Sequence, residues 1–252
     1  MAENSSIQSV DRLFQIMELL SRYPRGMGLM EICSQTQLPK GTVSRMLSAL
    51  GTNGYAVQDP ESRKYRLTMR MFEIGSRVAG CTDLLAAARP CLRELAARTG
   101  ETVHLVRRVQ DEVVYLYKEE GGASAVRMAS YVGLRNPMHC TGVGKSILAF
   151  LPDPEIAAIW ARTEVTAFTP HTIVTWDALE AEVARIRAQG YALDLQEHEL
   201  GVCCVSAPVL DLNGEPVAAI SISAPTLRMD RARLESLAPM VLEAARTIAQ
   251  TR

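Results

Sequence analysis

Two short amphipathic helices separated by a tight turn, at residues 29–35 and 40–50, constrain this chain more than any other feature. A longer amphipathic pattern over residues 6–22 precedes them. The second short helix has apolar residues at the spacing of one helical face, namely Val43, Met46, Leu47 and Leu50. A helix followed by two short helices with a few-residue turn between them predicts a helix-turn-helix.

The outward face of the second helix, and the segment after it, carry polar and basic side chains. Two β-rich runs at 55–58 and 64–67 are joined by a turn that contains Asp59 and Pro60, which predicts a hairpin, the wing of a winged helix. No acidic residue on the helix face would repel DNA phosphates. The residues expected to contact double-stranded DNA are Lys40, Thr42, Ser44, Arg45, Ser48 and Arg63.

The remainder of the chain predicts a second, larger domain of the α+β class. We expect a DNA-binding domain over 6–68, a linker helix over 69–81 and the second domain over 82–252. Expected strands lie at 102–107, 112–117, 126–128, 191–195, 202–210 and 215–223, and expected helices at 84–99, 143–151, 177–189 and from 230 onward. Strands of an antiparallel core with helices gathered outside it form this layout.

Composition excludes several classes of protein. The 252 residues are 48% hydrophobic and 22% charged, as in a globular chain, with a net charge of −1. No apolar run approaches the roughly 20 residues that span a bilayer, and the first residues lack a signal-peptide pattern. We therefore expect a cytoplasmic protein without a membrane partner. Six cysteines without metal-ligand spacing are expected to be reduced thiols, with no metal and no cofactor.

Catalytic motifs are missing or incomplete in the sequence. The run 142–146 resembles the end of a phosphate-binding loop, but His139 occupies the position that needs the first glycine. We therefore expect no enzyme. The alternative is an enzyme acting on a small acid with Asp194 and Cys204, although no histidine or second carboxylate is evidently paired with Cys204 to activate it. A third possibility is a DNA-binding scaffold that senses nothing.

Four runs resemble the IclR (isocitrate-lyase-regulator) family of transcriptional regulators, in the family's order. They are residues 37–47, residues 138–145, residues 190–194 leading to residues 199–208, and residues 218–225. Two departures are Gly41, where serine or alanine is common, and Cys203, where arginine is frequent. The resemblance implies a GAF-like effector-binding domain with a central antiparallel sheet and a ligand held on one side of that sheet.

By the same resemblance, the effector-binding residues are Met128, Gly142, Val143, Asp194, Cys204, Ser221 and Ser223. The residue pattern agrees in part. Ser221 and Ser223 lie two apart on an expected strand, so both hydroxyls face one side, while the isoleucines between and before them face the other. Backbone N–H groups at the helix start near Val143 could hold a carboxylate, and Asp194 could accept a hydrogen bond from a ligand hydroxyl.

These observations predict a sequence-specific transcriptional regulator, expected to repress a catabolic operon. Its effector is expected to be a small carboxylate such as a sugar acid or an aromatic acid. A homodimer, or a dimer of dimers, would place paired recognition helices on a palindromic operator. Effector binding would bias the DNA-binding domains through the helix at 69–81, provided that the effector prefers one state.

Overall fold

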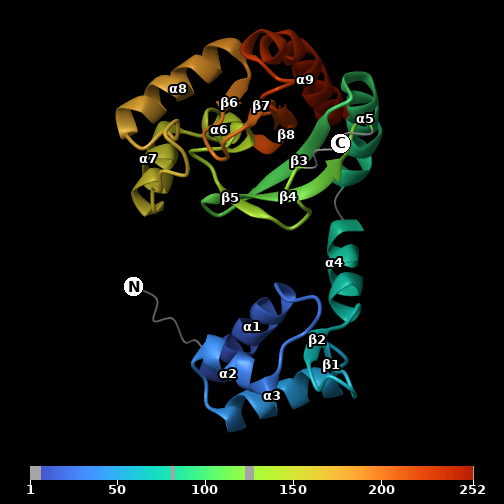
Figure 1. Ribbon diagram of the computed structural model, residues 1–252. Coiled ribbons are helices and arrows are strands. Elements are labelled where there is room, and N and C mark those ends of the chain that lie inside the picture. The colour runs from blue at the N-terminus through green and yellow to red at the C-terminus, as the bar shows by residue number, and fades with distance from the viewer. Residues whose placement is uncertain (1–6, 81–82, 123–127, 252) are drawn as a thin grey trace. The chain divides into compact units, whose positions relative to one another are not determined.

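The computed structural model describes residues 7–80, 83–122 and 128–251 (Figure 1). The chain divides into two compact units, residues 1–81 and 82–252. No helix in the described ranges is long and apolar enough to cross a membrane.

The N-terminal unit is a winged helix. Its elements are α1 (Gln8–Ser21), α2 (Leu29–Thr36), α3 (Lys40–Thr52), β1 (Ala56–Gln58), β2 (Tyr65–Leu67) and α4 (Arg70–Gly80). The core packs Ile16 of α1 and Ile32 of α2 against Leu47 of α3, all three almost fully buried. Gln37 ends α2 in a left-handed conformation with φ of 55°, and α3 begins after Pro39, so the predicted turn separates the two helices.

The wing is tied to the loop between α1 and α2. Strands β1 and β2 pair antiparallel, and Met27 exchanges two backbone hydrogen bonds with Tyr65 of β2, at 2.9 and 2.8 Å. Gly26 precedes this bridge with φ of +79°, and a side chain there would meet the Tyr65 carbonyl oxygen at 2.8 Å. A glycine is therefore required for the loop to approach the wing.

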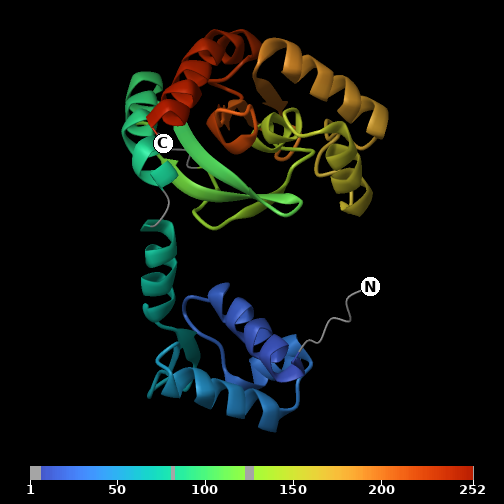
Figure 2. The same ribbon diagram turned by 180° about the vertical axis from the view of Figure 1, so that it is seen from behind.

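The C-terminal unit has one six-stranded antiparallel sheet between two groups of helices (Figures 1 and 2), so the α+β prediction is confirmed. Its helices are α5 (Asp83–Thr99), α6 (Gly142–Leu148), α7 (Asp153–Arg162), α8 (Trp176–Gln189) and α9 (Arg231–Thr251). Its strands are β3 (Thr102–Val109), β4 (Glu112–Glu119), β5 (Arg135–Pro137), β6 (Ala192–Leu195), β7 (Val202–Leu210) and β8 (Pro216–Pro225), in the spatial order β5-β4-β3-β8-β7-β6.

Alternation along β8 divides the core into two layers. Ile220 and Ile222 belong to the cluster formed with α5 and α9. Ala219 belongs to the cluster on the opposite face, formed with α6, α7 and α8. Ser221 and Ser223 are buried on this opposite face, as their place between the isoleucines predicts.

The structure differs from the sequence prediction at four local elements. Strand β5 and helix α7 were not expected: three residues are too few to show periodicity, and α7 begins beside Pro152 and Pro154, which disfavour an ongoing helix before them. Helix α6 ends at Leu148, earlier than expected. Of the strand expected at 126–128, Val126 lies outside the described residues and Met128 is not in a strand.

A buried ion cluster joins three elements of the C-terminal unit. Lys145 of α6 is fully buried and donates to the Leu193 carbonyl of β6 at 2.8 Å and to Glu197 at 2.5 Å. Its Nζ also lies 3.1 Å from Glu182 of α8, which pairs in turn with Arg185. Burial opposes the ammonium charge, but the two carboxylates outweigh it and raise the pKa of Lys145.

Replacing Lys145 is expected to destabilise the C-terminal unit strongly. Lys145→Met leaves Glu182 and Glu197 buried without their cation, which should lower the free energy of unfolding by about 3–5 kcal/mol. Urea unfolding followed by tryptophan fluorescence measures this unit, because Trp160 and Trp176 are the only tryptophans in the chain.

The matched control is Arg246→Met, which removes an exposed positive charge from α9. An equal, small effect of both substitutions would show that the cluster does not stabilise the unit.

Candidate functional site

Helix α3 presents a polar face away from the core of its unit. Val43, Leu47 and Leu50 are buried. Of the predicted DNA contacts on this helix, Thr42 is half-buried and the others are exposed, namely Lys40, Ser44, Arg45 and Ser48. An exposed helix face with hydroxyl, ammonium and guanidinium groups suits contact with base edges and phosphates in the major groove.

The wing tip exposes a second set of basic side chains. Asp59 shapes the turn, because its carboxylate accepts hydrogen bonds from the Ser62 N–H and hydroxyl, both at 2.7 Å. Arg63 is exposed and has φ of 59°, a left-handed conformation that glycine adopts more readily than an L side chain. Arg63 thus lies in the turn of the hairpin, next in sequence to the exposed Lys64 and close to the exposed Arg66.

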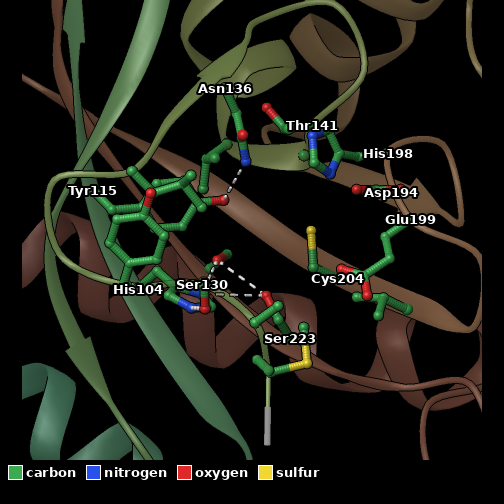
Figure 3. Close-up of a pocket in the computed structure, with 18 residues that line it drawn as sticks. His104, Tyr115, Ser130, Asn136, Thr141, Asp194, His198, Glu199, Cys204 and Ser223 are labelled. Atoms are coloured by element: carbon green, nitrogen blue, oxygen red, sulfur yellow. Dashed lines mark hydrogen bonds between the residues drawn. The ribbon is translucent and has the colours of Figure 1, made fainter. Parts of the chain in front are cut away.

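The C-terminal unit contains a cavity of about 220 Å³ on the α6 side of its sheet (Figure 3). Segments that are distant in sequence line it: β3, β4, the start of α6, β6, β7 and β8. All seven residues that the family resemblance implies are among the lining residues, namely Met128, Gly142, Val143, Asp194, Cys204, Ser221 and Ser223. The structure therefore brings this predicted set together in one place.

The floor of the cavity is a network around a buried histidine. His104 of β3 lies with its Nδ1 3.3 Å from the Ser221 hydroxyl and 3.4 Å from that of Ser223. Its Nε2 lies 2.8 Å from the Ser130 hydroxyl. The two β8 serines are 3.3 Å apart, and Tyr115 of β4 packs edge-on against the imidazole at 5.1 Å between ring centroids.

Burial sets the protonation of this network. Desolvation, together with the positive charge of Lys118, lowers the pKa of His104 to about 3, so the imidazole is neutral at physiological pH. Burial also raises the pKa of the Tyr115 phenol, to which the Asn136 side chain donates at 3.5 Å. These groups are therefore neutral hydrogen-bonding groups rather than charges.

A cover segment, residues 128–131, closes part of the cavity. Lys118 of β4 donates to the carbonyl oxygens of Met128 and Ser130, both at 2.9 Å. The Ser130 hydroxyl also contacts His104 on the floor. Two strands of the sheet thus hold the cover segment in place from below.

The start of α6 is packed too tightly for a side chain. A Cβ on Gly142 would lie 2.6 Å from the Cys204 sulfur and 2.9 Å from the Ser206 hydroxyl. The Gly144 N–H already donates to the Thr141 hydroxyl, which caps the helix. Of the backbone donors expected to face an anion at this helix start, that of Gly144 is therefore already occupied.

The thiol in the cavity is poorly suited to nucleophilic chemistry. Burial, with the nearby charge of Asp194, raises the pKa of Cys204 well above its ordinary value. Within the described residues, no histidine hydrogen bonds to this thiol; His104 is engaged by serines instead. A protonated thiol without a base does not support the small-acid enzyme considered as an alternative.

Several cavity residues were missed by sequence reasoning. They are His104, Tyr115, Ser130, Asn136, Thr141 and His198. His104 is paired directly with Ser221 across β3 and β8, but these strands are far apart in the chain, so their pairing gave no local pattern. The usable signal was a histidine among the apolar residues Val103, Leu105 and Val106 of the strand.

Comparison with known proteins assigns both units. A family profile described as the IclR helix-turn-helix domain matches residues 9–60. A second, described as bacterial transcriptional regulator IclR C-terminal, matches residues 76–250. The chain belongs to the IclR family. The resemblance seen in the sequence is thereby confirmed.

Other members of the IclR family match along nearly the whole chain. The regulator KdgR of Escherichia coli K12 is 37% identical over 243 residues, covering 96% of this chain and 92% of KdgR. XynR of the same organism is 38% identical over 238 residues, covering 94% of each. The crystal structure of Thermotoga maritima IclR superposes with a TM-score of 0.81 at 30% identity, covering 97% of this chain and 98% of that one.

These matches establish the general activity. The relatives are named transcriptional regulators, and this chain carries the same helix-turn-helix domain. This IclR-family chain is therefore a DNA-binding transcriptional regulator and not an enzyme.

Arg45 on the exposed face of α3 is expected to discriminate between base pairs. Arg45→Ala should weaken binding to the specific site by about five- to hundredfold and relax the preference at one base position. Fluorescence anisotropy on the intergenic DNA beside the gene, and on single-base variants of it, measures both effects. The control, Arg231→Ala, removes an exposed charge from the C-terminal unit; unchanged base preference in the Arg45 variant would contradict this placement.

Arg63 is expected to contact a phosphate. Arg63→Ala should weaken binding to all sequences alike and reduce the slope of log affinity against log salt by about one. Arg63→Gly should do the same, because glycine fits the φ of this position and removes only the side chain. Loss of preference for one base pair at constant salt slope would indicate a base contact instead.

Proposed function

We propose that this IclR-family regulator represses a catabolic operon and that a small carboxylate effector, bound in the cavity of the C-terminal unit, controls its affinity for DNA. The observation that carries the proposal is the convergence of buried polar groups from separate strands on one cavity. A small number of polar groups that converge on one cavity is the usual means of fixing a ligand's orientation.

The size and lining of the cavity favour a small polar acid. Its volume of about 220 Å³ is below the roughly 300–1,000 Å³ of typical drug-sized sites. Met128 and Val143 supply apolar wall, while Ser221 and Ser223 supply hydroxyl donors. We propose that the acid group lies by these hydroxyls and the start of α6, and that Asp194 bonds another oxygen of a sugar acid or aromatic acid.

The regulator is proposed to bind a palindromic operator as a homodimer or a dimer of dimers. Paired recognition helices then enter successive major grooves on one side of the duplex. Large apolar side chains exposed on α1, on α4 and in the turn before α4 support contact with a second copy, because water contact with them is unfavourable. They include Val10, Phe14, Met69, Met71, Phe72 and Ile74. Helix α4, which directly follows the wing, is proposed to convey the effector signal.

The two β8 serines provide the test. Ser221→Ala with Ser223→Ala removes two neutral hydrogen bonds worth about 0.5–1.5 kcal/mol each. The concentration of effector that releases the protein from DNA should rise by roughly fivefold to a hundredfold. D-Gluconate and 4-hydroxybenzoate are the probes, titrated into the complex with the intergenic DNA and followed by anisotropy.

Affinity for DNA without effector should match the unsubstituted protein. The control, Ser236→Ala, removes an exposed serine hydroxyl from α9. If both probes release the double variant as readily as the unsubstituted protein, the serines do not bind the effector. If neither probe binds the unsubstituted protein or releases it from DNA, the proposal of a sugar-acid or aromatic-acid effector is contradicted.

A further inference from the structure

The charges at the cavity surface do not suit an anion. Among the described residues that line it, the side chains able to carry charge at neutral pH are the carboxylates of Asp194 and Glu199. Neither lysine nor arginine is among those lining residues. His104 and His198 do not replace them, because burial lowers the pKa of both.

Asp194 is the more deeply placed of the two carboxylates. It is 6% exposed and lies at the end of β6, opposite Cys204 of β7. Its Oδ1 accepts the backbone N–H of Glu197 at 2.7 Å. In Figure 3 the carboxylate lies on the same side of the cavity as His198 and Thr141.

The nearest cation is already balanced by other carboxylates. The Lys145 ammonium contacts Glu197 at 2.5 Å and Glu182 at 3.1 Å, and its other hydrogen bond goes to the Leu193 carbonyl. An ionised Asp194 is therefore an additional negative charge in a buried region. A carboxylate effector brought into the same small cavity would be repelled by it.

The surroundings of Asp194 point to one titrating group in the lining near neutral pH. Burial and the charge of Glu197 raise the pKa of Asp194 to about 7, against the attraction of Lys145 and two backbone N–H groups. The other ionisable groups of the surrounding elements that interact with it are Tyr115, Cys140, Lys145, Glu197, His198, Cys203 and Cys204. Burial raises the pKa of the phenol and of the three thiols, that of Cys140 to about 12.

We propose that Asp194 takes up one proton from solvent when the anionic effector binds, and donates it through Oδ2 to an effector oxygen. The effector carboxylate keeps its charge, Oδ1 keeps the Glu197 N–H, and no further charge enters the cavity. This inference rests on the proposed effector class. In this proposal the protonation of Asp194 removes the negative charge that would repel an anionic effector. A lysine or arginine in the lining is then not needed to offset that charge.

The sign of the pH dependence follows from this linkage. Below pH 7 the free site already holds the proton, and effector affinity is at its full value. As the pH rises above 7 the proton must be taken up during binding, so affinity falls. With a pKa of about 7 in the free protein, affinity should fall about tenfold between pH 6 and pH 8.

The test begins with the carboxyl group itself, in the full-length protein without ligand. Carbon-13 NMR with labelled aspartate carboxyls, assigned by the signal lost in Asp194→Asn, should show Asp194 titrating near pH 7. A midpoint at or below pH 5 overturns the inference, whatever any ligand does.

Calorimetry then measures proton uptake with D-gluconate and 4-hydroxybenzoate. In buffers of different ionisation enthalpy at pH 8, close to one proton should be taken up per bound acid. The uncharged counterparts, D-glucitol and 4-hydroxybenzyl alcohol, should bind without net uptake. Asp194→Asn keeps a donor but cannot ionise, so its affinity for the acids should change less than twofold between pH 6 and pH 8.

Two further variants identify the group responsible. Glu199→Gln should retain the tenfold pH dependence, whereas its loss in that variant would move the proton to Glu199 and overturn the assignment. Arg127 lies outside the described residues, so Arg127→Ala tests whether a cation neutralises the effector instead. The inference would be overturned if this variant no longer bound the acids and the unsubstituted protein took up no proton on binding them. Binding of the acids with an affinity that does not change between pH 6 and pH 8 would also overturn the inference about Asp194, while leaving the proposed function intact.

Discussion

One fully buried ammonium group holds together the segments that build the cavity of the C-terminal unit. Lys145 projects from α6, whose first residues line the cavity, and binds the backbone of β6, the strand that carries Asp194. It also bridges to α8 through Glu182. Removing a lysine from water is costly, and only close carboxylates and a carbonyl acceptor offset that cost. The shape of the cavity therefore depends on a charge that never touches solvent.

The same cluster decides the electrostatics of the site. Because Glu182 and Glu197 already balance Lys145, the neighbouring Asp194 is left without a cation of its own. Apart from the exposed Glu199, the other described side chains that line the cavity are neutral, since burial keeps the imidazole of His104 uncharged. The neutral groups of this lining are hydrogen-bonding groups, and the proton on Asp194 is the variable that the proposed effector would change.

Local patterns in the sequence predicted much of the fold. The apolar spacing over 40–50, with Pro39 before it, gave the recognition helix, and the hairpin after it gave the wing. Alternation over 220–223 correctly separated the isoleucines from the serines on two faces of β8. The short strand β5 was not predicted, because its three residues show no periodicity. The DNA contacts and the effector contacts were predicted from the helix face and from the family resemblance, and remain predictions.

What the sequence determined by itself was therefore the class of the protein, the winged helix, the two faces of β8 over 220–223 and, through the family resemblance, the set of side chains expected at the cavity. Only the tertiary structure decided that His104 joins that set, because it pairs with Ser221 across strands more than a hundred residues apart. It also decided that Lys145, within a run resembling a phosphate-binding loop, turns inward to two glutamates. Pairing between distant strands and the burial of a charge depend on the whole packed unit, and local periodicity carries no information about either.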